Sequence, residues 1–338
     1  MAPKNKSKTM RQSPKSKSKR KQQKSKSKSN SKFGGSSPGS KKLKMEHLPN
    51  DMLQLIYDRI PRGKDRVALA STSRRMNTIP YAFESAEHFI RTQADVEAAI
   101  ENRAERVTFK NRALVGELVR MPHVKYLAVD LLRLGELPPL PPKLQTLDCE
   151  INDLTALPAL PSTLKKINYS YNPLTRVPIL PPTLISLKCI ATGKLPVLPS
   201  TLKELDCEGN SLGQLPALPP TLVLLSCADN NLTKLPALPP TLKNLDCAGN
   251  DLGNLPARLP STLIHLYCFA NELTRLPKLP STLKTLDCGD NPLLTRLPTL
   301  PPTLQVLECR ATNIVKLPTL PSTLKELDCE TWIDLPIL

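Results

Sequence analysis

The chain has 338 residues, with 47 lysines and arginines against 30 aspartates and glutamates, which gives a formal net charge of +17. That length allows about two domains. Residues 1–44 hold sixteen Lys or Arg and no Asp or Glu, so the basic balance belongs to a tail and excludes a strongly basic folded domain. No window approaches the roughly 18 apolar residues of a membrane span. No apolar stretch follows the N-terminal charges as it would in a signal peptide.

The tail, residues 1–44, is rich in Lys and Ser and offers almost no apolar side chain to bury, so we expect it to be disordered. Three roles stay open: a solubility tail, a nuclear-import signal, or a weak, salt-sensitive contact to nucleic acid or an acidic membrane. Phe33 is its one aromatic residue, so no base-stacking platform is predicted. We expect the protein in the cytoplasm or the nucleus, with its nine cysteines as thiols.

Residues 45–82 predict a small helical domain. Asp51 suits the first turn of a helix that begins after Pro49. An apolar stripe with helical spacing follows, made of Leu53, Ile56, Tyr57 and Ile60. This helix ends at Pro61, and a second helix is predicted over residues 65–76.

The same segment resembles the F-box family over residues 46–80. The matching positions are Leu48, Pro49, Asp51, Leu53, Ile56, Ile60, Pro61, Leu69, Ser73, Arg74 and Arg75. F-boxes dock on a Skp-type adaptor of cullin ubiquitin ligases, and the resemblance implies that the adaptor-binding residues are Leu48, Pro49, Leu53, Ile56, Ile60 and Leu69. Met76 and Asn77 follow the paired arginines where F-boxes often carry an aromatic residue, which leaves the third helix open. The alternative is a helical cap that protects the first repeat.

From residue 137 to residue 338 one unit recurs, with the pattern L-x-x-L-x-C-x-x-N-x-L-x-x-L-P-x-L-P-x-T. Ten copies spaced by 18 to 21 residues begin at Leu144, Leu164, Leu184, Leu202, Leu222, Leu242, Leu263, Leu283, Leu304 and Leu324. Residues 83–136 are predicted to be a linker and N-terminal cap. This cap contains a degenerate copy around Leu127 and a capping strand at Val107 and Phe109. Period and pattern are those of the leucine-rich repeat.

The repeat pattern predicts a solenoid with a parallel sheet on its concave face. The second Leu and the Cys are two residues apart, so both point inward from a strand, and stacked copies bury a continuous core. The Asn three residues after the Cys can bond the backbone where the chain turns. Thr192 and Thr312 interrupt this ladder, and we expect an irregularity at the 18-residue copy that holds Thr192. The P-x-x-P half excludes a helix and predicts an extended or polyproline II convex face. Trp332 is predicted to help cover the C-terminal end.

All nine cysteines occupy one repeat position, and Tyr169 stands in the copy that lacks a Cys. A column of equivalent residues on parallel strands points one way and cannot surround a zinc ion, so we interpret it as a stack of small buried side chains. The four histidines have no metal-binding spacing, and no phosphate loop, nucleophile elbow or kinase motif occurs. The sequence predicts a non-enzymatic protein with neither metal nor cofactor.

The outward-facing strand positions predict a binding face. Its central column is Asp148, Asn168, Lys188, Asp206, Ser226, Asp246, Tyr267, Asp287, Glu308 and Asp328. Six of these ten residues are acidic, which favours a basic protein partner and disfavours nucleic acid on the solenoid. Aromatic rings at His265, Tyr267 and Phe269 break the pattern, and such rings are typical of interaction hot spots. The predicted partner-binding residues are Asp206, Asp246, His265, Tyr267, Phe269, Asp287 and Glu308.

The repeats resemble those of bacterial effector leucine-rich-repeat proteins. Together with the tail and the F-box-like segment, they are also similar to F-box repeat proteins of large DNA viruses of amoebae, which would place the protein in a host cell. These resemblances imply a substrate-recognition subunit of a cullin-type ubiquitin ligase, which holds a Skp-family adaptor with residues 46–80 and a protein target with the repeats. Two alternatives stay open: a plain binding scaffold or effector whose helical segment is only a cap, and a nucleic-acid tether that acts through residues 1–44.

Overall fold

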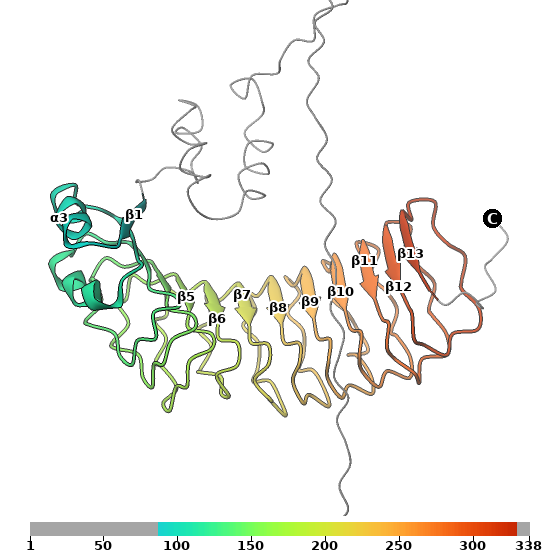
Figure 1. Ribbon diagram of the computed structural model, residues 1–338. Coiled ribbons are helices and arrows are strands. Elements are labelled where there is room, and N and C mark those ends of the chain that lie inside the picture. Colours follow the sequence, from blue (N-terminus) through green and yellow to red (C-terminus); the bar gives the residue numbers. More distant parts are fainter. Residues whose placement is uncertain (1–86, 330–338) are drawn as a thin grey trace, which may run out of the picture. The chain divides into compact units, whose positions relative to one another are not determined.

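The computed structural model describes residues 87–329, all within one compact unit of the chain. The predictions for the tail, the F-box-like segment and Trp332 lie outside the described residues. The described part is one sheet of thirteen parallel strands, paired strictly in chain order (Figure 1). This confirms the predicted leucine-rich-repeat solenoid.

The strands carry the following bounds. They are β1 (Glu87–Ile90), β2 (Arg106–Phe109), β3 (Tyr126–Ala128), β4 (Thr146–Asp148), β5 (Lys166–Asn168), β6 (Ser186–Lys188), β7 (Glu204–Asp206), β8 (Leu224–Ser226), β9 (Asn244–Asp246), β10 (His265–Tyr267), β11 (Thr285–Asp287), β12 (Val306–Glu308) and β13 (Glu326–Asp328). From β3 onward each strand has three residues, one strand per repeat. The register therefore places equivalent residues of successive repeats side by side.

Each short strand forms because its apolar residues alternate. In β9 the middle residue, Leu245, is fully buried, and so is Cys247 directly after the strand. The chain then turns sharply, and the residue before the Asn takes a left-handed backbone conformation, as at Asp229 (φ 50°) and Gly249 (φ 58°). This turn ends the strand after three residues and directs the chain toward the convex side.

The buried asparagines hold these turns together. The side-chain amide of Asn250 donates to the carbonyls of Cys227, Cys247 and Ala248 at 3.0, 3.1 and 2.9 Å, and its oxygen accepts from the Leu232 N–H at 3.0 Å. One side chain thus joins its own turn to the preceding one, as the sequence predicts. The ladder residues are Asn152, Asn172, Asn210, Asn230, Asn250, Asn271 and Asn291.

A second ladder, which the sequence reasoning missed, runs through the threonine at the end of each repeat. The Thr241 hydroxyl donates to the carbonyls of Pro220 and Leu222 at 2.9 and 2.7 Å. Equivalent bonds recur at Thr163, Thr183, Thr201, Thr221, Thr262, Thr282, Thr303 and Thr323. From residue 137 to residue 329 the structure contains no helix, which agrees with the proline-rich pattern. In place of packed helices, the threonine hydrogen bonds connect successive turns in this half of the repeat.

The cysteine column is buried, except that Cys329 in the last described turn is partly exposed. Thiols at several positions of the column donate to a carbonyl of the following turn, as at Cys227, whose Sγ donates to the Asp246 carbonyl at 3.3 Å. Burial raises the pKa of the Cys189 thiol to about 12. These groups stay neutral thiols and act as small packing residues.

The turn that holds Thr192 is irregular, as predicted. It is two residues shorter than the common 20-residue copy and lacks the core leucine found elsewhere after the Asn. The Asn210 oxygen compensates by accepting from the N–H groups of both Thr192 and Gly193, at 2.6 and 2.7 Å. A pocket of about 120 Å³ opens at this place, lined in part by Thr192 and by Tyr169, which is only 1% exposed. The large ring of Tyr169 thus stands beside the space that the missing leucine leaves.

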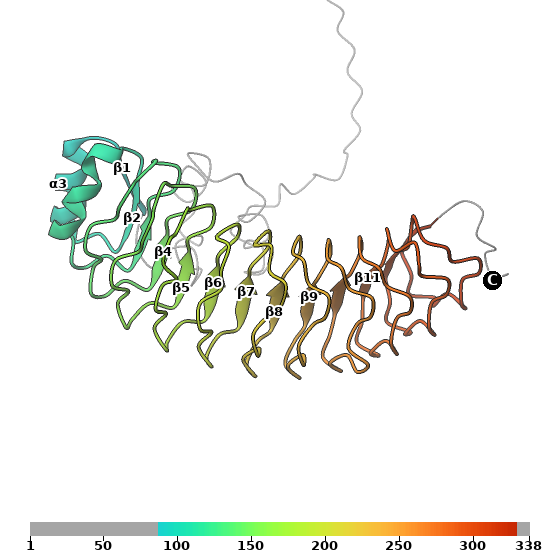
Figure 2. The ribbon, with the colours of Figure 1, turned by 90° about the horizontal axis from the view of Figure 1, so that it is seen from below.

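Two helical elements lie at the N-terminal end of the sheet. Helix α3 (Gln93–Glu101) lies between β1 and β2 in the chain and begins with a capping box formed by Thr92 and Asp95. A 3-10 helix, η3 (Arg112–Arg120), follows β2. Figure 2 shows both beside β1 and β2 at this end. The sequence predicts the strand at Val107 but specifies neither the helix nor β1.

Candidate protein-binding face

The inner face of the solenoid is built by the first and last residue of each strand, since the middle residue is buried. The last residues form a continuous row in register: Asp246 pairs with Tyr267, Tyr267 with Asp287, and Asp287 with Glu308. We name these four residues the acidic row. Toward the N-terminal side the row continues through Ser226, Asp206 and Lys188. The structure therefore brings together Asp206, Asp246, Tyr267, Asp287 and Glu308, all predicted site residues.

Among the described residues, no cationic side chain pairs with the acidic row. Within residues 87–329, ion pairs on this inner face join Lys188 to Asp206, at 3.4 Å, and Arg310 to Asp328, and none reaches the acidic row. Asp246 Oδ1 accepts from the Ala248 N–H at 3.2 Å, and Asp287 Oδ1 accepts from the Gly289 N–H at 3.1 Å. Each backbone bond fixes one carboxylate oxygen and leaves the charge unneutralised.

The electrostatics of the row reflect this imbalance. Partial burial is the main cause that raises the pKa of Asp287 to about 6, and the charges of Glu308, Asp290 and Asp246 raise it further against the Gly289 hydrogen bond. The pKa of Asp246 is raised as well, mainly by burial and to a lesser extent by the charges of Asp229 and Asp206. Carboxylates crowded on adjacent strands repel one another, and a cation that bound here would relieve the repulsion.

Aromatic side chains interrupt the carboxylates at β10. The rings of His265 and Tyr267 are parallel within 6°, with centroids 6.5 Å apart. His265 Nδ1 lies 3.1 Å from the hydroxyl of Thr285 on the neighbouring strand β11, and this hydrogen bond holds the imidazole in place. Phe269 lies two residues beyond β10 and is 38% exposed. The three predicted aromatic residues thus belong to one turn, with Tyr267 inside the acidic row.

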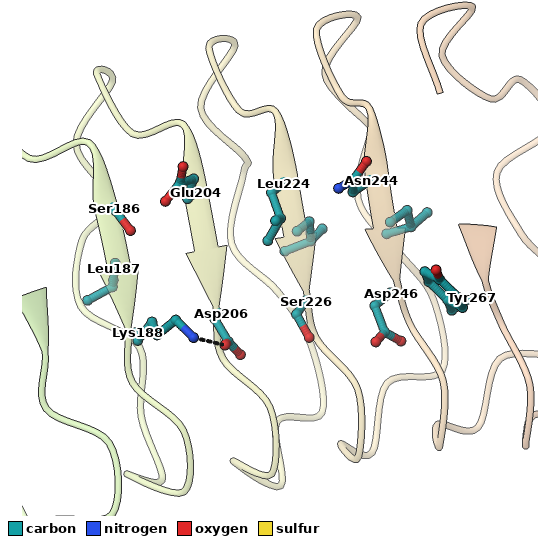
Figure 3. Close-up of a pocket in the computed structure, with 12 residues that line it drawn as sticks. Ser186, Leu187, Lys188, Glu204, Asp206, Leu224, Ser226, Asn244, Asp246 and Tyr267 are labelled. Atoms are coloured by element: carbon teal, nitrogen blue, oxygen red, sulfur yellow. Dashed lines mark ion pairs between the residues drawn. The ribbon is translucent and has the colours of Figure 1, made fainter. Parts of the chain in front are cut away.

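A hollow of about 310 Å³ lies on the inner face over β6–β10 (Figure 3). Tyr267 and Asp246 stand at one end, and the Lys188–Asp206 ion pair stands toward the other. Leu224 and Asn244 also line it, and the sequence reasoning did not select them. Both residues could have been selected from the sequence, because each occupies the solvent-facing first position of a strand.

Asp206 is more enclosed than the sequence suggests, with a side chain that is 17% exposed. Its Oδ1 is buried and has no hydrogen-bond partner among the described residues. No group of three or more His, Cys, Asp or Glu residues within 87–329 is arranged to hold a metal ion. No helix in this part of the chain has the length and apolar character to span a membrane.

No protein-family model matches the chain, and no curated protein matches it by sequence. Among solved structures, YopM from Yersinia enterocolitica is 35% identical, covers 64% of this chain and aligns with a TM-score of 0.56. The functional domain of InlJ from Listeria monocytogenes, which includes a cysteine ladder, is 26% identical, covers 66% of this chain and aligns with a TM-score of 0.51. YopM from Yersinia pestis, a leucine-rich effector protein, is 31% identical over 59% of this chain, with a TM-score of 0.42. The chain spans 53%, 56% and 60% of those three chains, respectively.

Proposed function

We propose that this leucine-rich-repeat protein, which resembles bacterial effectors, is a scaffold that binds a basic protein partner on its inner sheet face between β7 and β12. The observation that carries the proposal is the acidic row, four register positions with three carboxylates, one partly exposed tyrosine and no cationic partner in the described part. Carboxylates on adjacent strands repel one another, and a positive surface that covers them relieves this repulsion.

A charge-matched comparison tests this proposal. The probe is an unstructured 15-residue peptide of lysine, arginine and serine, titrated against the full chain at low ionic strength. We expect the variant Asp246→Asn/Asp287→Asn/Glu308→Gln to bind it at least tenfold more weakly. The control variant, Asp153→Asn/Asp251→Asn/Glu272→Gln, changes the same net charge at exposed positions on the turns and should bind like the parent. Equal losses in both variants would show that only net charge matters and would refute a specific face.

The proposal extends to a cellular role as the substrate receptor of a cullin-type ubiquitin ligase in the cytoplasm or nucleus. Its support is the F-box-like sequence of residues 46–80, in which Leu53, Ile56 and Ile60 share one helical face of the predicted segment. In this role the segment binds a Skp-type adaptor, the inner face binds the target, and the chain itself performs no catalysis.

Co-purification with a Skp-type adaptor tests the cellular role. We expect the full chain to retain the adaptor and the variant Leu53→Asp/Ile56→Asp to lose it, while the circular dichroism of the repeats stays the same. If the parent captures no adaptor, the ligase role is wrong and the scaffold role stands alone, with residues 46–80 as a cap.

A further inference from the structure

We propose that Tyr267, together with Asp246 and Asp287 on either side of it, forms a subsite for one arginine side chain of the partner. This inference rests on the proposed function and specifies which side chain the inner face recognises. The subsite consists of these three residues and does not include the remaining carboxylates of the inner face.

The register of the sheet places the three side chains of the subsite together. Tyr267 pairs in register with Asp246 on β9 and with Asp287 on β11, so the two carboxylates flank the phenol ring across adjacent strands. Strands in a sheet are about 4.8 Å apart, which separates the two aspartates by roughly 10 Å at the backbone. A guanidinium group laid over the ring can direct N–H groups toward carboxylates on both sides, because its donors spread in a planar fork.

Both aspartates of the subsite keep an unused acceptor atom. Asp246 and Asp287 each use Oδ1 to accept one backbone N–H bond, and that bond fixes the carboxylate. Within residues 87–329 no hydrogen bond or ion pair reaches the Oδ2 atom of either residue. Figure 3 shows Asp246 and Tyr267 next to each other at the end of the hollow. Two oriented acceptors beside an aromatic face are the groups that an arginine engages by charge-assisted bonds and by stacking.

The same sheet already contains an arginine stacked on a tyrosine of the next strand. Arg106 on β2 and Tyr126 on β3 are register partners, and the Arg106 guanidinium carbon lies 4.0 Å from the centre of the Tyr126 ring. The strand spacing of this solenoid therefore suits a guanidinium stacked on a tyrosine of the next strand. At Tyr267 the neighbouring strands supply aspartates in place of an arginine, so these strands leave the place of the cation to the arginine of the partner.

A lysine would use this subsite less well. Its ammonium is a compact, strongly hydrated charge, and it cannot stack a flat surface on the ring while it reaches carboxylates on both sides. The subsite therefore predicts a preference for arginine over lysine. It predicts a larger preference over citrulline, which keeps the planar shape and loses the charge.

The test uses the full chain and three capped nonapeptides of glycine and serine whose central residue is arginine, lysine or citrulline. Their dissociation constants are measured by saturation-transfer NMR at low ionic strength. We expect the citrulline peptide to bind at least tenfold more weakly than the arginine peptide, with the lysine peptide in between. Tyr267→Leu and Asp246→Asn should each weaken arginine binding about fivefold to tenfold and should remove most of the preference over lysine.

Matched controls separate this subsite from the wider face. Tyr171→Leu and Asp251→Asn change exposed side chains on the turns and should leave the arginine peptide unaffected. If the citrulline peptide binds as well as the arginine peptide, or if no peptide binds at millimolar concentration, the subsite is wrong. If arginine binding survives at Tyr267→Leu but is lost at Asp206→Asn or Glu308→Gln, the inner face still binds basic partners and only the location proposed here fails.

Discussion

Replacement of Asn230 by alanine is expected to destabilise the solenoid strongly, and the size of the effect can be worked out bond by bond. The Asn230 amide donates to the carbonyls of Cys207, Cys227 and Ala228 at 3.1, 3.1 and 2.9 Å. Its oxygen accepts from the N–H groups of Asn210 and Leu212 at 3.1 and 2.9 Å. The side chain thus makes five hydrogen bonds to the backbone, but the loss of each one does not destabilise the fold to the same extent.

The three carbonyls keep a donor after the substitution. Cys207 O still accepts from the Asn210 amide at 2.8 Å, and Cys227 O from the Asn250 amide at 3.0 Å. Ala228 O still accepts from the Gly209 N–H at 3.1 Å. The loss therefore falls on the N–H groups of Asn210 and Leu212, which have no other acceptor among the described residues. Each unsatisfied buried donor costs about 1 to 3 kcal/mol. Because the Leu212 N–H can gain some access to water, we expect the free energy of unfolding to fall by about 3 to 4 kcal/mol in total.

The assay is native-state hydrogen exchange of the Leu212 and Asn210 amides, combined with urea unfolding of the full chain. Asn231→Ala is the matched control, since Asn231 is the next residue and its side chain is exposed. We expect the control to stay within about 0.5 kcal/mol of the parent. Exchange rates at Leu212 that are the same in both variants would refute the argument that the asparagine ladder holds the turns.

Three further predictions follow from single side chains. The Asp287 pKa of about 6 lies above its ordinary value of 3.8, so the folded chain binds this proton more tightly, and the free energy of unfolding falls as pH rises from about 4 to 6. Asp287→Asn should therefore raise stability by about 1 kcal/mol at pH 7.5 and leave it unchanged at pH 3.5, as measured by urea midpoints. Tyr169→Cys should cost about 2 to 4 kcal/mol in thermal unfolding, because the ring stands beside the gap of the shortened turn. Tyr169→Phe should cost less than about 1 kcal/mol, since the buried hydroxyl makes no well-formed hydrogen bond and has the Cys189 thiol as a weak partner. Thr241→Val should cost about 1 kcal/mol through its two lost inter-turn bonds, whereas Thr233→Val on the exposed turn should be neutral.

The sheet could be predicted from the sequence because each strand is specified locally. A leucine and a cysteine two residues apart, such as Leu245 and Cys247, define the buried side of a strand, and the Asn that follows marks its turn. Strict spacing then stacks the copies, so the register of the acidic row follows from counting. The binding role of that row is still a prediction, since sequence and geometry give only its charge and its exposure.

Other features depend on contacts that the repeat pattern does not encode. The threonine ladder was missed because Thr after Pro-x is typical of a solvated turn, whereas the Thr241 hydroxyl reaches the preceding copy. Helix α3 has two buried residues, Val96 and Ala99, which is too weak an apolar pattern to recognise. The sequence reveals both the Tyr169 exception and the shortened copy at Thr192, but only the fold places them on one pocket.

The central claim, that the inner face binds a basic partner at the acidic row, is tested most directly by site-specific photo-cross-linking. A benzoylphenylalanine is placed at Thr285, which lies beside His265 on the inner face, or at Thr299, which is exposed in the proline-rich half of a repeat. We expect the basic 15-residue peptide to cross-link to the chain modified at Thr285 and not to the chain modified at Thr299. Cross-linking from Thr299 alone, or equally from both positions, would contradict it.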